Sequence, residues 1–406
     1  MADKGAKTMM EKPAIAGGTP VRSTPLYYGH QYIDEADIEA VAEVLRSDYL
    51  TCGPKIAQLE QKLCELTGAK YAVAVSNGTA ALHIACMAAG LKEGDELITT
   101  PITFAASANC ALYCGAKPVF ADINEKTYNI DPLEVGKKIT EKTKVIIPVD
   151  FTGQAADMEP IMELAREKGI VVIEDAAHSI GTLYQGKAVG SIADMTTFSF
   201  HPVKTVTSGE GGAVLTNDRD YYEKLCLYRT HGITREQSLL ERESHGPWYY
   251  EQIDLGYNYR ITDMQAALLI SQLDKMELFR QRRKEIVRRY DEAFSKMPGI
   301  VVQEEIKESD TTRHLYILRI RPEVLNVDRK GFFEALAAEG IHCNVHYIPV
   351  YRHPYYEALG YPEGLCPKAE KLYNEMMSLP LYYAMSDQDV DDVINAVHKL
   401  VMYYCK

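Results

Sequence analysis

The feature of this chain that most restricts its fold is the alternation of short apolar runs with amphipathic helical runs over residues 71–216. Runs such as 71–75, 145–149 and 170–173 are apolar at nearly every position, and helical periodicity separates them. Strands that are apolar on both faces and are joined through helices are typical of a mainly parallel sheet that is covered on both sides. We therefore predict an α/β fold in which ligands bind beyond the carboxyl ends of the strands.

The periodicity also predicts how the chain divides into domains. A helical pattern starts at Thr262, a residue type favoured as an N-cap, and continues to Pro298, so one long helix should lead out of the large domain. After it, strands alternate with helices in a smaller α+β unit. Residues 1–20 are polar and show no periodicity, and we expect a loose arm there. The predicted division is an N-terminal arm over 1–25, a large domain over 26–275, and a connecting helix with the small domain over 276–406.

Charge and cysteine content exclude several classes of protein. The chain has 57 acidic and 44 basic residues, a formal net charge of −13, which repels phosphate backbones, so we expect no nucleic acid partner. It has no apolar run long enough to cross a bilayer, and no apolar run follows its basic start, so we expect neither a membrane span nor a signal peptide. The 9 cysteines are scattered and form no C-x-x-C pair. This pattern predicts a cytoplasmic protein without disulfides or a bound metal.

Two residues suggest the chemistry of the chain. Lys204 lies just past a predicted strand, and Asp175 ends an earlier one. Pyridoxal phosphate requires such a pair, because a lysine holds its aldehyde as a Schiff base and a carboxylate keeps its ring nitrogen protonated. The alternative is that Lys204 is one surface lysine among many, and its position past a strand end is what favours the catalytic interpretation.

The cofactor would also need a site for its phosphate. The segment S-N-G-T-A, residues 76–80, lies where a strand gives way to a helix, so Gly78 and Thr79 can offer backbone N–H groups and the positive end of the helix to an anion. Ser199, shortly before Lys204, can add a second hydroxyl. An ordinary helix start is the alternative interpretation of the first motif.

The cofactor ring needs two covered faces. Phe104 follows the next strand and can cover one face, while the small side chain of Ala177 leaves room at the other. The alternative is that Phe104 is a core aromatic, and the local pattern favours neither interpretation.

Beyond these residues, the chain resembles a known family. It contains, in order, S-N-G-T-A-A-L, T-P-I-T-F-A-A-S-A-N, I-E-D-A-A-H-S-I-G, F-S-F-H-P-V-K-T-V-T-S-G-E-G-G-A-V-L-T-N-D, G-Y-N-Y-R-I-T-D-M-Q-A-A-L and S-L-P-L-Y. These motifs resemble those of the DegT/StrS-type nucleotide-sugar aminotransferases over nearly the whole chain. The resemblance implies the pyridoxal-phosphate-dependent transferase fold type I, like that of aspartate aminotransferase, with a large mixed, mainly parallel sheet domain and a small α+β C-terminal domain. It also implies a homodimer with active sites at the interface.

The resemblance assigns roles to residues of this sequence. It makes Lys204 the Schiff-base lysine and proton shuttle, and Asp175 the partner of the ring nitrogen. His178 would lie near the phenolic oxygen, and Asn258 would reach the phosphate of the neighbouring subunit. The complete expected cofactor set is Gly78, Thr79, Phe104, Asp175, Ala177, His178, Ser199, Lys204 and Asn258.

The implied reaction is amino transfer, since family members that dehydrate their substrate carry histidine where this chain keeps Lys204. Glutamate would leave its amino group on the cofactor as pyridoxamine phosphate, and a UDP-linked 4-keto-6-deoxy sugar would take it at carbon 4. The segments 245–252, 313–316 and 344–351 most resemble those of the UDP-sugar 4-transaminases of pseudaminic acid synthesis. A sugar diphosphate needs a local cation, and each candidate has a structural role as its alternative. The expected substrate residues are Arg260, Arg313, His314, His346 and Tyr347.

Two further functions stay open at this point. One is another aminotransferase of the family, acting on a GDP- or dTDP-linked keto sugar or on a cyclitol ketone. The other is a regulator that binds the cofactor without turnover, because a fold alone does not establish catalysis. The presence of both Lys204 and Asp175 argues against the regulator, since binding alone would not require both.

Overall fold

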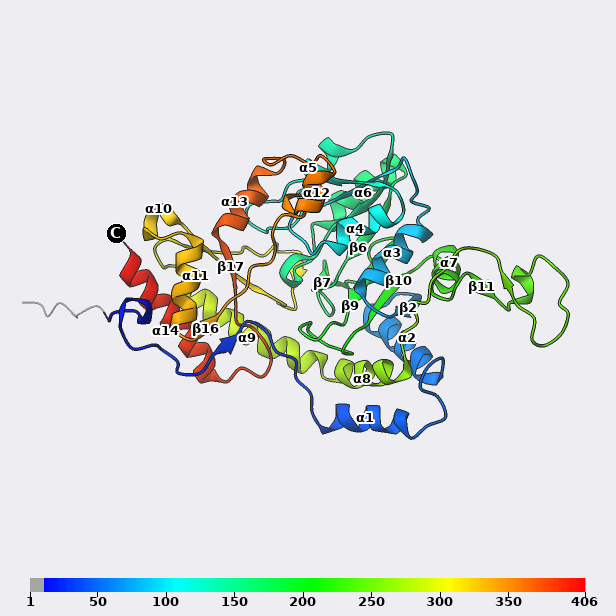
Figure 1. Ribbon diagram of the computed structural model, residues 1–406, viewed down its shortest axis with the longest axis horizontal. Helices are drawn as coiled ribbons and strands as arrows, with labels where there is room; N and C mark the ends of the chain where they lie inside the picture. The colour runs from blue at the N-terminus through cyan, green and yellow to red at the C-terminus, as the bar shows by residue number, and fades with distance from the viewer. Residues whose placement is uncertain (1–10, 406) are drawn as a thin grey trace, which may run out of the picture.

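A seven-stranded mixed sheet forms the centre of the computed structural model, which describes residues 11–405 (Figure 1). The strand order is β2, β10, β9, β6, β5, β3, β4. Strand β10 runs antiparallel to both of its neighbours, and the other neighbouring pairs run parallel. The predicted mixed, mainly parallel sheet is therefore confirmed. The strands are β2 (Tyr71–Val75), β3 (Glu96–Thr99), β4 (Lys117–Phe120), β5 (Thr143–Ile147), β6 (Val171–Asp175), β9 (Met195–Ser199) and β10 (Gly212–Thr216).

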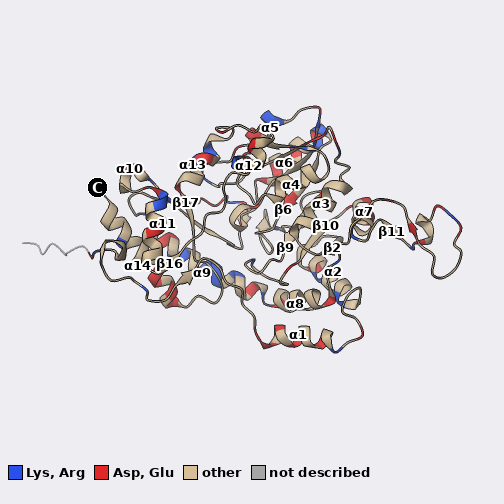
Figure 2. Cartoon of the chain, in the orientation of Figure 1, with Lys and Arg blue, Asp and Glu red and all other residues tan. Residues whose placement is uncertain are grey.

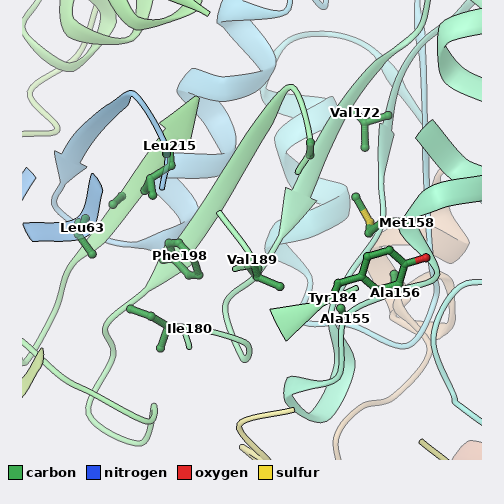
Figure 3. Packing of buried hydrophobic residues seen from close by; sticks show 14 of the residues in the cluster. Leu63, Ala155, Ala156, Met158, Val172, Ile180, Tyr184, Val189, Phe198 and Leu215 are labelled. Atoms are coloured by element: carbon green, nitrogen blue, oxygen red, sulfur yellow. The ribbon is translucent and has the colours of Figure 1, made fainter. Parts of the chain in front are cut away.

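Helices cover both faces of this sheet, which explains why its strands are apolar throughout. In β10, Ala213 and Leu215 belong to a core that includes residues of α2, α6 and α8, and Figure 3 shows this core from close by. Val214, between them, belongs to a second core with residues of α3, α4 and α7. Side chains of a strand alternate between the two faces, so both sets must be apolar. The helices are α2 (Pro54–Thr67), α3 (Gly78–Ala88), α4 (Ala106–Tyr113), α5 (Pro132–Lys138), α6 (Met158–Lys168), α7 (Arg219–Arg229) and α8 (Asp263–Asp274).

The C-terminal part of the chain forms a separate core. An antiparallel sheet in the order β13, β15, β17 packs with α9, α11 and α14, and β16 pairs in parallel with β1 from near the N-terminus. This agrees with the expected small α+β unit. Its elements are α9 (Met276–Phe294), β13 (Ile300–Val302), β15 (Tyr316–Ile320), α10 (Pro322–Leu325), α11 (Arg329–Ala338), β16 (Ile341–His342), α12 (Pro354–Ala358), α13 (Pro367–Glu375), β17 (Met376–Leu379) and α14 (Asp387–Tyr404).

The N-terminal arm differs from the expectation. The carboxylate of Glu339 accepts the backbone N–H groups of Ala14 at 2.7 Å and Val21 at 2.9 Å, and the ammonium of Lys399 pairs with it at 3.0 Å. Arg22 forms ion pairs with two aspartates of α14. The expectation of a loose arm is therefore wrong for residues 14–22, because a buried carboxylate holds their backbone. Residues 1–10 of that arm lie outside the described part, and the boundaries after residues 25 and 275 stay predictions.

The single long helix expected from Thr262 is wrong as well. The chain forms α8 and α9 with a break at Lys275, whose backbone has φ −99° and ψ 0°. The ammonium of Lys275 pairs with Asp34 at 2.8 Å and Asp37 at 2.6 Å, at the acidic start of α1 (Glu35–Leu45), which Figure 2 shows in red. The sequence has no Pro or Gly at this break, and its apolar periodicity continues through it. The break therefore could not be seen in the sequence pattern.

A long segment between α7 and α8, residues 231–257, projects away from the sheet (Figure 1). Its two strands, β11 (Ile233–Thr234) and β12 (Glu251–Gln252), pair with each other. Trp248 and Leu255 of this segment are 69% and 65% exposed. The remaining short elements are β1 (Leu26–Tyr27), β7 (Leu183–Tyr184), β8 (Lys187–Ala188), β14 (Ser309–Asp310) and the 3-10 helices 14–16, 151–153, 237–239 and 350–352.

Three further features bear on the class of protein. Among the described helices, none combines the length and the apolar character needed to cross a membrane. The cysteines within residues 11–405 form no disulfide. The same residues contain no cluster of His, Cys, Asp and Glu that could hold a metal ion.

Candidate active site

The residues expected to bind a cofactor come together at the carboxyl edge of the sheet. Asp175 ends β6, Ser199 ends β9, and Gly78 begins α3 directly after the turn that follows β2. Lys204 lies in the loop between β9 and β10, where its backbone N–H donates to the carbonyl of His201 at 2.9 Å. This loop reverses the chain between the antiparallel strands β9 and β10, and β6, which ends at Asp175, lies on the other side of β9.

Asp175 is buried, and its carboxylate has two hydrogen-bond donors. The hydroxyl of Ser107, on α4, donates to Oδ2 at 2.6 Å, and the backbone N–H of Ala177 donates to Oδ1 at 3.2 Å. Burial raises the pKa of Asp175, because the charged form loses its hydration, while the Ser107 hydrogen bond acts in the opposite direction. Ser107 was not among the predicted site residues, although a serine within the alanine-rich helix α4 is a signal that could have identified it.

Lys204 is close enough to Asp175 for their charges to interact. Burial lowers the pKa of Lys204 to about 8, and the charge of Asp175 acts against this shift. A lysine with such a pKa has an appreciable fraction of neutral amine near pH 8, and the neutral amine is the form that attacks an aldehyde. The structure thus places the two residues together, as the sequence predicts.

The turn after β2 is a close-fitting cradle. A Cβ atom added to Gly78 would lie 2.9 Å from the Cβ of Ser199, and one added to Gly212 would lie 2.5 Å from the carbonyl carbon of Asn77. Only glycine therefore fits at these two positions. The side chain of Asn77 accepts the N–H of Ala80 at 2.8 Å as the N-cap of α3, and the first N–H groups of a helix have no partner within it. Such a helix start suits a phosphate group.

Three histidines lie close enough to Lys204 for its charge to lower their pKa values. The His178 ring lies 4.4 Å from the His314 ring, and His178 Nε2 contacts the hydroxyl of Tyr347 at 3.2 Å. Burial lowers the pKa of His178 and of His314 well below 6.5, and the charge of Lys204 adds to both shifts, so both rings are neutral at pH 7. Within the described residues, neither Nδ1 atom has a hydrogen-bond partner.

His346 differs from the other two histidines because its Nδ1 atom contacts the hydroxyl of Ser378 at 2.7 Å. Burial lowers the pKa of His346 to about 4, so it is uncharged at neutral pH. Its ring lies 5.1 Å from the ring of Tyr28, which the N-terminal segment brings to the site. Tyr28 was not among the predicted site residues, because no local pattern shows that this distant segment returns to the site.

Phe104 borders an open pocket of about 650 Å³ beside this cluster. Its side chain is 64% exposed, and its ring lies 6.3 Å from that of Tyr347. The alternative of a core aromatic is therefore wrong for Phe104. The pocket is lined by mainly apolar and aromatic residues, which include Tyr113, Val345, Ile348, Tyr355 and Tyr356.

The two arginines that are expected to bind the sugar diphosphate differ in their ion pairing. Arg313 is buried and pairs with Glu305 at 2.8 Å, so its charge is already balanced. Arg260 lies opposite Val75 at the end of β2 and forms no ion pair with any described residue. Asn258, two residues earlier, has an exposed side chain. In the single chain, Asn258 is thus open to contact from outside.

Three features of this site fit pyridoxal phosphate. They are the cradle at Gly78, the lysine and carboxylate at one sheet edge, and the Nδ1 atom of buried His178, which has no partner among the described residues. Each meets a need of this cofactor: an anion site, a Schiff-base amine, a partner for the ring nitrogen and a polar contact near the ring.

Comparison with known proteins agrees with this arrangement. The model of the DegT/DnrJ/EryC1/StrS aminotransferase family matches residues 31–398. The spore coat polysaccharide biosynthesis protein SpsC of Bacillus subtilis is 42% identical over 93% of this chain and 97% of its own length. The UDP-4-amino-4,6-dideoxy-N-acetyl-beta-L-altrosamine transaminase of Campylobacter jejuni is 38% identical over 93% of this chain and 99% of its own.

Solved structures define the class further. Helicobacter pylori PseC, an aminotransferase involved in the biosynthesis of pseudaminic acid, superimposes with a TM-score of 0.87 at 33% identity, covering 94% of this chain and 100% of its own. The fold is thus that of the pyridoxal-phosphate-dependent transferases of fold type I. This chain belongs to the DegT/DnrJ/EryC1/StrS aminotransferase family. It is a sugar aminotransferase that uses pyridoxal phosphate, and the regulator without turnover is thereby excluded.

Proposed function

We propose that this enzyme moves the amino group of glutamate to carbon 4 of a UDP-linked 4-keto-6-deoxy-N-acetyl hexose, for the synthesis of a bacterial surface glycan of the pseudaminic acid type. The observation that supports this substrate is the similarity over nearly the full length to the Campylobacter jejuni transaminase and to PseC. The open pocket beside Phe104 and Tyr347 offers room for a sugar.

The cofactor would be held by residues of the carboxyl edge. In this proposal the cradle of Gly78, Thr79 and Ser199 binds the phosphate, Asp175 faces the ring nitrogen, and His178 lies near the phenolic oxygen. Phe104 and Ala177 border the two faces of the ring. When bound, pyridoxal phosphate supplies an aldehyde that condenses with amines and a protonated ring that withdraws electrons from the reacting carbon.

Lys204 would serve as both the anchor and the proton carrier. With glutamate bound, the amine of Lys204 would stay tethered by its own chain at the carboxyl edge, where it could act on the α-proton of the substrate. Its lowered pKa, about 8, is close to neutral pH, and a general base works best when its pKa lies near the working pH. Lys204 can therefore take the α-proton of glutamate and, in the second half of the reaction, deliver a proton at carbon 4 of the sugar.

The substrate contacts differ in the support they have. Arg260 is the better candidate for the sugar diphosphate, because Arg313 is already paired with Glu305. His314, His346 and Tyr347 would contribute neutral hydrogen-bonding groups near the sugar, since burial keeps both histidines uncharged and raises the pKa of Tyr347.

We also propose a homodimer with shared sites, in which Asn258 of one subunit reaches the phosphate of the other. The exposed side chain of Asn258 and the exposed apolar residues of the projecting segment support this arrangement. A single chain that left Trp248 and Leu255 in water would carry an unfavourable apolar surface.

The substrate is tested through the second half-reaction. The pyridoxal phosphate enzyme is first converted with glutamate, and the pyridoxamine phosphate form is then mixed with UDP-, GDP- and dTDP-linked 4-keto-6-deoxy sugars in separate samples. We expect rapid return of the pyridoxal phosphate absorbance with the UDP-linked N-acetyl sugar alone. Faster return with a GDP- or dTDP-linked sugar, or with a cyclitol ketone, would contradict the proposed substrate while leaving the aminotransferase class intact. No conversion by glutamate, but conversion by another amino acid, would contradict the donor.

A further inference from the structure

A chain of hydroxyl groups leads to Asp175 from the helix that follows β3. Thr103 Oγ1 and Ser107 Oγ lie 2.7 Å apart, and Ser107 Oγ lies 2.6 Å from Asp175 Oδ2. Thr103 and Ser107 are only 2% and 1% exposed, so water does not replace these contacts. Both residues belong to the segment T-P-I-T-F-A-A-S-A-N, in which Phe104 is the residue with an assigned role.

The direction of these hydrogen bonds follows from the chemistry of the groups. An ionised carboxylate only accepts, so the single proton of the Ser107 hydroxyl points to Asp175. Thr103 must then donate to the oxygen of Ser107, although the Ser107 hydroxyl can also turn to the carbonyl of Phe104 at 3.3 Å. Thr103 therefore holds the Ser107 oxygen in place, and Ser107 supplies the donor to Oδ2.

We propose that Ser107 is a positioning residue that keeps Asp175 ionised and aimed at the ring nitrogen, with Thr103 as the outer support of the same chain. The inference rests on the proposed role of Asp175 as the ring-nitrogen partner. A proton shared by a carboxylate and a ring nitrogen lies on the nitrogen when the carboxylate is stabilised by other donors. Ser107 and the N–H of Ala177 are those donors, one for each carboxylate oxygen.

Other charged and titratable groups also act on this carboxylate, and they stay in place in each variant considered below. Lys204 is the nearby cation, and the charge of Asp175 in turn raises the pKa of Tyr347. The groups packed around the end of β6 are Asp150, Glu174, Lys204, His178 and Tyr347.

The chain offers a matched control one strand away. Ser179 Oγ donates to Asp150 Oδ2 at 2.6 Å, the same distance as in the Ser107 contact, and both of these residues are fully buried. Ser179→Ala therefore removes the same type of hydrogen bond from a different buried carboxylate. It should lower stability as Ser107→Ala does, but it leaves both donors of Asp175 in place.

The test measures the ring nitrogen directly. Wild type, Ser107→Ala, Thr103→Val and Ser179→Ala are loaded with pyridoxal phosphate that carries an isotope label at the ring nitrogen, and the chemical shift of that nitrogen is followed against pH. In Ser107→Ala we expect the chemical shift to move toward that of an unprotonated ring nitrogen at each pH, because a carboxylate with one donor fewer draws the shared proton toward itself. The single-turnover rate with glutamate should fall about tenfold, the scale of one hydrogen bond to a charged group, with little change in the glutamate concentration at half saturation. Thr103→Val should change both in the same direction by less, and Ser179→Ala, which can act on Asp175 only through the charge of Asp150, should change both least.

Circular dichroism and thermal unfolding establish which variants are folded. A folded Ser107→Ala protein with a wild-type nitrogen shift and rate would overturn the proposal, as would an equal change in Ser179→Ala. If Ser107→Ala does not fold, Thr103→Val decides: a wild-type shift in that variant contradicts the hydroxyl chain. Recovery of the shift in Ser107→Thr, which restores a hydroxyl, would support it. If wild type itself showed no protonated ring nitrogen, the role of Asp175, and not that of Ser107 alone, would be wrong.

Discussion

The carboxyl edge of the sheet and the projecting segment 231–257 are built in opposite ways. At the carboxyl edge, Asp175 and Lys204 are enclosed by their own chain, and the hydrogen bonds that orient Asp175 come from neighbouring elements of the same chain. In the projecting segment, large apolar side chains such as Trp248 and Leu255 stay in contact with solvent. A single chain thus encloses the lysine and the carboxylate, but it leaves the projecting segment without a core.

The projecting segment keeps its shape through local polar contacts instead. The carboxylate of Glu251 accepts the N–H of Glu241 at 2.6 Å, the N–H of Arg242 at 3.0 Å and the hydroxyl of Tyr249 at 2.6 Å. The hydrogen bond from Tyr249 is the largest cause of a lowered pKa of Glu251. Short polar contacts of this kind fix a loop but contribute little hydrophobic stabilisation. The contrast suggests that chemistry resides in the first region and subunit contact in the second.

The largest expected effect is that of Lys204→Ala. Loss of both the Schiff-base amine and the proton carrier should lower turnover by about a thousandfold or more, while the phosphate cradle still binds the cofactor. Borohydride reduction of wild type should attach the cofactor to the peptide that contains Lys204, which mass spectrometry can identify. Lys224→Ala, at an exposed position on α7, is the control and should behave like wild type. Near-normal turnover of Lys204→Ala, or label on another lysine, would show that the buried edge is not the reaction centre.

Asp175→Asn should have the next largest effect. The amide keeps the shape of the side chain but cannot stabilise a proton on the ring nitrogen, so the single-turnover rate with glutamate should fall by more than it does in Ser107→Ala. The cofactor should stay bound, as measured by its absorbance after gel filtration. An unchanged single-turnover rate would mean that Asp175 has a structural role only.

The pH dependence of cofactor capture tests how strongly the edge desolvates Lys204. Burial lowers the pKa of Lys204 from 10.5 to about 8, so the reactive neutral amine grows as pH rises toward 8 and is nearly complete above it. Below that pKa, the capture rate of cofactor-free enzyme should rise about tenfold for each pH unit and then level off. The rate is followed by visible absorbance and divided by that of free lysine with pyridoxal phosphate at the same pH, which corrects for titration of the cofactor. A rate that keeps rising beyond pH 10 would place Lys204 in a water-like environment.

The structure also shows which parts of the architecture the sequence could predict. The strands of the central sheet were predictable, because burial on both faces leaves a local apolar signature in runs such as 71–75. The break at Lys275 was not, since ion pairs to Asp34 and Asp37, more than two hundred residues earlier, accompany it without any Pro or Gly. The hydrogen bonds that fix the N-terminal arm could not be predicted for the same reason, because their acceptor, Glu339, lies more than three hundred residues later in the chain.

The residues of the candidate site also differ in whether the sequence could predict their contacts. Lys204 and Asp175 each follow a strand, so the topology of a parallel sheet predicts that they meet. The pairing of Arg313 with Glu305 and the approach of His314 to His178 are tertiary contacts between side chains, which no local pattern records. Ser107 falls between these cases, because its place within a family motif was visible and its partner was not.

Complementation between subunits tests whether Asn258 serves the active site of the other subunit. Lys204→Ala and Asn258→Ala should each be weakly active alone, but a mixed dimer would contain one site with both lesions and one with neither. Under random exchange about half of the dimers are mixed, and each has one intact site of two, so activity should recover to about a quarter of wild type. Exchange is verified with differently tagged chains. If exchange occurs and no activity returns, Asn258 serves the site of its own chain.

The smallest effect is a spectral one, and it concerns the projecting segment alone. The chain contains 1 tryptophan, Trp248, which is 69% exposed in the single subunit, so its fluorescence reports this segment without interference from other tryptophans. If a second copy covers the segment, the emission should shift to shorter wavelength as protein concentration rises and sedimentation shows dimers forming, because the indole leaves water. Trp248→Phe supplies the tyrosine background, and Trp248→Ala should weaken the dimer while leaving cofactor capture by Lys204 unchanged. Emission that stays at the position of a solvated indole in a proven dimer would show that the segment points away from the interface. In that case the exposed apolar residues would have to be explained by a different partner, and the trans contribution of Asn258 would lose its structural support.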